Sequence, residues 1–142
     1  MAPELHNAAQ LSRVISQVAA PAFLLSAVAS LLSVLITRMN RVVDRSRSIS
    51  ALPEAERARV ENELPDLRRR AEFMHRAIFW CAGSGIATCM LVIIAFTSAL
   101  FDLEHERGAA VLFIIAMSLF TATLVYLARE VRLSASDIHR LD

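Results

Sequence analysis

Arginine is the residue type in this chain best suited to binding chemistry, and its distribution is uneven. Ten of the fifteen arginines lie between Arg38 and Arg76, and lysine is absent. Each guanidinium is a planar, permanently charged group that pairs with carboxylates or phosphates. We interpret two groups of arginines as contacts for anionic lipid headgroups or, in an oligomer, as charges at the inner mouth of a pore. The first group is Arg38, Arg41 and Arg45, and the second is Arg68, Arg69, Arg70 and Arg76.

The other reactive residue types form no catalytic or metal-binding pattern. The four histidines are scattered, and Cys81 and Cys89 are too far apart to form a disulfide within one helix. An acidic turn at 102–106 contains oxygen ligands for a cation but lacks the spacing of a known motif. We therefore expect no enzymatic activity, no cofactor and no metal. The net charge of +1 gives no reason to expect a nucleic-acid partner.

Three uncharged runs must position the arginines: residues 14–37, 77–101 and 108–128. Hydrophobic residues make up 56% of the 142 residues, and the mean hydropathy of +0.48 is high for a soluble domain. Each run is long enough to cross a bilayer core of ~30 Å, which takes about 20 helical residues. The sequence therefore predicts a single-domain, all-α membrane protein. Its three transmembrane helices should span about residues 15–36, 77–100 and 108–127, after a short polar tail.

The charged segment between the first two spans, about residues 37–76, also has a helical pattern. From Val60 to Ile78, apolar residues recur at steps of four and three, as in a coiled-coil seam. Pro53 predicts a helix start, because proline fits the first helical position. Pro65 interrupts the seam and predicts a restart, with Asp66 in the new first turn. We expect a cytoplasmic helical hairpin built from extensions of the first two spans.

The distribution of arginine also predicts an orientation. With three spans, the segment 37–76 and the C-terminus share one side, which holds thirteen arginines, whereas the other side holds two. Cytoplasmic loops carry the excess of basic residues in membrane proteins. We therefore expect the N-terminus outside and the C-terminus in the cytoplasm.

Small residues form a stripe along the first span. Its members recur at a spacing near 3.5 and are Ala22, Ser26, Ser30, Ser33 and Thr37. Such a stripe is typical of a close helix–helix seam, because small side chains let two backbones approach in lipid. It could instead line a narrow, wet pathway, which would require a homo-oligomer because three helices cannot enclose one. No ionisable residue lies within a predicted span, which argues against an ion-coupled transporter but not against a passive channel.

Two segments resemble a family of small bacterial membrane proteins known as a domain of unknown function. They are residues 38–47 (RMNRVVDRSR) and 67–78 (LRRRAEFMHRAI), and the resemblance extends over about residues 15–135. It implies a three-span protein of the bacterial inner membrane and supplies no activity.

Two functional hypotheses follow from these patterns. The first is an oligomeric membrane protein that acts as a passive ion channel or pore, with the first span facing the axis. The second is a non-conducting membrane scaffold or regulator whose arginine-rich cytoplasmic hairpin binds anionic lipid or a protein partner.

Overall fold

The computed structural model describes residues 2–101 and 106–138, which form helices and connecting turns without a strand. Three of the helices are long and apolar enough to cross a membrane, as the uncharged runs predict. The all-α fold with three candidate spans is thus confirmed. In chain order the elements are α1 (Ala2–Ser50), α2 (Glu54–Val60), the 3₁₀ helix η1 (Glu61–Glu63), α3 (Leu64–Phe101) and α4 (Glu106–Ile138).

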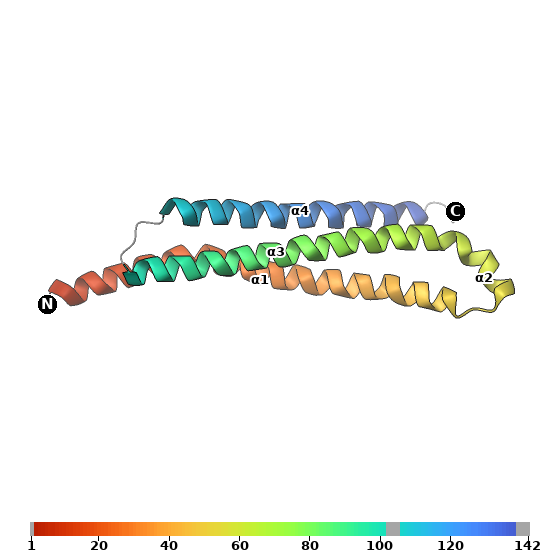
Figure 1. Ribbon diagram of the computed structural model, residues 1–142, viewed down its shortest axis with the longest axis horizontal. Helices are drawn as coiled ribbons and strands as arrows, with labels where there is room; N and C mark the ends of the chain where they lie inside the picture. The colour runs from red at the N-terminus through yellow and green to blue at the C-terminus, as the bar shows by residue number, and fades with distance from the viewer. Residues whose placement is uncertain (1, 102–105, 139–142) are drawn as a thin grey trace.

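The three long helices lie side by side, with α3 between α1 and α4 (Figure 1). α3 packs along both neighbours, whereas α1 and α4 touch each other only locally. At a rise of 1.5 Å per residue, α1 is about 73 Å long, more than twice the thickness of a bilayer core. The chain therefore forms a bundle of helices that is longer than one membrane crossing.

A seven-residue repeat of buried side chains holds this bundle together. Positions seven apart face the same side of helices that wind around each other with a left-handed supercoil. On α1 the repeat consists of Val28, Leu35, Val42 and Ile49; on α3 of Leu67, Met74, Cys81 and Thr88; and on α4 of Ala116, Thr123 and Glu130.

Small residues of α3 allow close contact with both neighbouring helices. The buried Ser84 hydroxyl donates a hydrogen bond to the Ala116 carbonyl of α4 at 2.8 Å. On the other side, a Cβ added at Gly85 would lie 3.3 Å from the Val28 side chain of α1. The small residues of the second span thus serve mainly to pack α3 against α1 and α4, as close backbone approach in lipid requires.

The charged segment is helical, and apolar side chains from its two ends share a buried cluster. Val42 and Ile49 of α1 form a buried cluster with Leu67 of α3, and Val60 and Leu64 pack at its edge. This cluster extends the α1–α3 contact beyond the uncharged runs.

The helix boundaries agree with the sequence at one proline and differ at the other. α3 restarts at Leu64 with Asp66 in its first turn, as Pro65 predicts. Pro53 caps α2 with a ψ of 149° instead of occupying the first helical position, so that helix begins one residue later than expected.

The helices extend beyond the outer ends of the first and third predicted spans. α1 includes the residues before the first span, and α4 continues through residue 138 instead of ending near 127. In α4 the heptad repeat continues to Glu130, and its ion pairs favour the additional turns.

Candidate functional site

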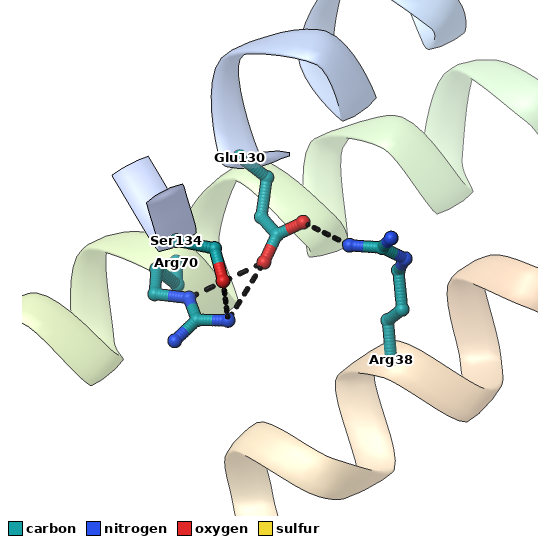
Figure 2. A network of polar contacts seen from close by, with 4 residues as sticks. All are labelled: Arg38, Arg70, Glu130 and Ser134. Atoms are coloured by element: carbon teal, nitrogen blue, oxygen red, sulfur yellow. Dashed lines mark hydrogen bonds and ion pairs between the residues drawn. The ribbon is translucent and has the colours of Figure 1, made fainter. Parts of the chain in front are cut away.

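A buried carboxylate connects the three long helices. Glu130 of α4 is 1% exposed, and both of its oxygens accept hydrogen bonds from arginines (Figure 2). Arg38 of α1 donates from Nη1 to Oε2 at 2.9 Å. Arg70 of α3 donates from Nε and Nη2 to Oε1 at 3.2 and 3.0 Å, and its Nη2 also donates to Ser134 Oγ at 3.2 Å. We call these four residues the arginine–glutamate cluster.

The heptad repeat places this cluster in line with the hydrophobic core. Glu130 lies seven residues after the buried Thr123, so the repeat turns its side chain toward α3. Arg70 lies seven residues before the buried Ala77 and therefore belongs to a corresponding row on α3. Burial of a lone carboxylate would be costly, and here two guanidinium groups offset that cost. The Arg38 and Arg70 side chains are themselves 41% and 22% exposed and so retain contact with solvent.

A cavity of about 370 Å³ opens beside the cluster. Four arginines and one carboxylate line it, which gives a net formal charge of +3. Val42 and Leu67 add an apolar part to the wall. The lining residues are Arg38, Arg41, Val42, Arg45, Leu67, Arg70, Glu130 and Ser134.

A second ion pair lies next to the cavity. Arg45 forms a bidentate contact with Glu63 of η1, in which Nε and Nη2 both donate to the carboxylate at distances from 2.9 to 3.1 Å. Both side chains are about half exposed, at 51% and 46%. This pair joins the end of α1 to the turn before α3 and neutralises one of the four lining arginines.

The structure separates the predicted arginines into two sets. Three arginines of α1 and one of α3 line the cavity together: Arg38, Arg41, Arg45 and Arg70. The remaining three, Arg68, Arg69 and Arg76, are exposed outside it. Arg69 lies over the Phe73 ring of its own helix, 6.0 Å from the centroid.

The small-residue stripe on α1 faces away from the rest of the protomer. All five members, Ala22, Ser26, Ser30, Ser33 and Thr37, are exposed. At about 100° per residue, the stripe lies ~180° around α1 from the buried row that contains Val28 and Leu35. The Thr37 hydroxyl donates to the Ser33 carbonyl at 2.9 Å, so its hydrogen bond stays within α1. The stripe is therefore not the seam between α1 and α3.

Glu130 and Ser134 were not identified from the sequence. Glu130 lies between Arg129 and Arg132, beyond the end of the third predicted span. The seven-residue repeat of α4 indicates that Glu130 is buried. Ala116, Thr123 and Glu130 are spaced seven apart, and the first two belong to a predicted span. A carboxylate that continues a buried row is expected to find a basic partner.

Among the described residues, no group of three or more His, Cys, Asp or Glu is placed to hold a metal ion. The acidic turn at 102–106, considered above for a cation, lies outside the part of the chain whose side chains are described. The arginine–glutamate cluster is thus electrostatic in character: it joins helices and leaves a surplus of positive charge facing a cavity.

The fold and the site together define an all-α membrane protein with three candidate spans and a buried arginine–glutamate cluster. The chain belongs to the family described as Protein of unknown function (DUF2721), which matches residues 18–140. The match includes the whole cluster. No curated protein and no solved structure matches the chain.

Proposed function

We propose that the protein is an oligomeric membrane protein that forms a passive ion channel or pore, with α1 facing the axis. The exposed stripe on α1 carries this proposal. Serine and threonine hydroxyls gain little stabilisation on a surface that faces lipid. At a subunit contact or along a water-filled axis, they find polar partners for hydrogen bonds. Since α3 covers the opposite side of α1, the stripe is free to meet other copies of the chain.

The orientation proposed for this channel has the segment 37–76 as a cytoplasmic helical hairpin, in the bacterial inner membrane. The N-terminus would lie outside and the C-terminus in the cytoplasm. The arginine excess on one side of the spans supports this orientation. The exposed Arg41 would then lie at the inner mouth, where positive charge favours anions.

Substitutions in the stripe test the channel. Purified protein in planar bilayers should conduct, and Ser30→Leu and Ser33→Leu should change the conductance while leaving the oligomeric mass in detergent unchanged. Ser118→Leu is a matched control, because Ser118 is exposed on α4, away from the stripe. The channel proposal fails if the wild-type protein is silent and the two stripe variants dissociate the oligomer.

The basic cavity favours a second candidate function, a non-conducting scaffold or regulator that binds anionic lipid or a protein partner at its arginine-rich end. The supporting observation is that four arginines from α1 and α3 face one space instead of pointing outward separately. This candidate predicts an oligomer whose axis is closed by packed side chains or lipid, with no current under any voltage.

A further inference from the structure

We infer that the cavity beside the arginine–glutamate cluster binds the phosphate group of an anionic phospholipid. The inference rests on the proposed membrane placement but not on conduction or oligomerisation. It assigns a ligand to a specific space, whereas the sequence pattern indicates only a basic surface.

The depth of the cavity fits a lipid headgroup. The uncharged run of α1 ends just before Arg38, and that of α4 ends just before Arg129, next to Glu130. Arg70 lies seven residues before the uncharged run of α3, or about 10 Å along the helix. Headgroup regions add roughly 5–8 Å to each side of the hydrocarbon core. The lining arginines therefore lie at or just beyond the level where lipid phosphates are found.

The cavity keeps a positive charge even after the carboxylates beside it have formed their ion pairs, as an anion-binding site requires. Glu130 engages Arg38 and Arg70, and Glu63 engages Arg45. With both carboxylates counted, a net charge of +2 remains around the cavity. Guanidinium groups have five N–H donors each, so Arg38 and Arg70 retain donors that Glu130 does not use.

Arg41 is the lining arginine best placed to meet an incoming anion. It is exposed, and none of the three ion pairs among the described residues includes it. Glu130 acts as a positioning residue, because its two oxygens hold Arg38 and Arg70 on either side and fix the direction of their free N–H groups.

The level of the cavity favours a lipid over a free anion. Val42 and Leu67 contribute to the wall but are only 5% and 7% exposed, so they offer a ligand little apolar surface. The lining arginines lie at or just beyond the level of the lipid phosphates, where a bilayer supplies a phosphate group directly beside them. Basic pockets between transmembrane helices on the cytoplasmic side are known sites for cardiolipin and similar headgroups.

Native mass spectrometry of the full chain in neutral detergent tests this inference. Wild-type protein is titrated with cardiolipin and, separately, with phosphatidylcholine, and the bound fraction of each is measured. We expect wild-type protein to prefer cardiolipin. Arg41→Gln should weaken cardiolipin binding roughly ten-fold, as expected for the loss of a charged hydrogen bond. Arg68→Gln is the matched control and should stay within about two-fold, because Arg68 is an exposed α3 arginine outside the cavity.

A further arm adds millimolar inorganic phosphate, which should leave the lipid bound. The inference is overturned if cardiolipin and phosphatidylcholine bind alike, or if Arg68→Gln weakens binding as much as Arg41→Gln does. Displacement of the lipid by inorganic phosphate would overturn it in favour of a free-anion site. The same spectra report the subunit number. A monomer that retains cardiolipin would contradict the proposed oligomer alone, and an oligomer without this preference would contradict the lipid site alone.

Discussion

Glu130→Gln should destabilise the protein more than Glu63→Gln, although Glu63 also binds an arginine. The substitution keeps the shape of the side chain but removes the charge that holds Arg38 and Arg70. One substituted oxygen becomes an amide NH₂ group, which cannot accept the hydrogen bond that the carboxylate accepted. Two guanidinium groups then face each other across a neutral amide.

The magnitude follows from the burial of the three partners. Removing one partner of a fully buried ion pair costs about 3–5 kcal/mol. Glu130 is 1% exposed, but Arg38 and Arg70 are 41% and 22% exposed and can regain water. We therefore expect a loss of about 2 kcal/mol in the free energy of unfolding.

Glu63→Gln is the internal control for this prediction. Glu63 also binds an arginine through two nitrogens, but both side chains of that pair are about half exposed. Exposed ion pairs contribute roughly 0–1 kcal/mol, so this substitution should be nearly silent.

Thiol modification during denaturant-induced unfolding in detergent provides the assay. Cys81 is buried between α3 and α1, where its Sγ lies 3.6 Å from the Val28 carbonyl oxygen, and it becomes reactive when these helices separate. The exposed Cys89 is first replaced by serine so that one reporter remains. Circular dichroism follows the loss of helix in parallel. The reasoning is refuted if Glu130→Gln costs no more than Glu63→Gln, because the buried cluster would then contribute no more than an exposed pair.

Two further predictions concern the packing of α3. Gly85→Val should destabilise the α1–α3 contact by about 1–3 kcal/mol, because even a Cβ at this position is tightly placed against Val28. Gly83→Ala should be near neutral, because its Cβ would lie 3.6 Å from the Leu119 side chain, an ordinary contact distance. Melting temperatures in detergent compare the two, and equal losses would contradict the packing described for Gly85. Ser84→Ala should cost about 0.6 kcal/mol by removing the hydrogen bond to Ala116, a typical value between helices in lipid. Ser118→Ala removes only a hydrogen bond within α4 and should leave the unfolding curve unchanged. Equal losses of stability in Ser84→Ala and Ser118→Ala would contradict a stabilising hydrogen bond between α3 and α4.

The sequence contains enough information to predict the spans, because charge is excluded from a hydrocarbon core over a known length. It also indicates the apolar contacts of the charged segment, since the pattern around Leu64 and Leu67 repeats locally. Both features depend on neighbours within a few turns. The structure confirms three apolar helices and the restart of α3 after Pro65.

The candidate site could be predicted only in part, because its contacts are distant in sequence. Arg38 and Arg70 lie 92 and 60 residues from Glu130. The arginine pattern alone gives no reason to separate Arg70 from Arg68, although one lines the cavity and the other is exposed outside it. That difference depends on the rotation of α3 against two neighbours, which only the packed helices fix.

The central place of α3 has a consequence for the order of assembly during synthesis. Chains emerge from the ribosome N-terminal end first, so α1 and α3 are available to pair before α4 exists. Arg38 and Arg70 are therefore made before the carboxylate that joins them. Glu130 is made last of the three, and its ion pairs with both arginines form only once α4 docks on α3. The arginine–glutamate cluster is thus a contact that the first two long helices cannot complete without α4.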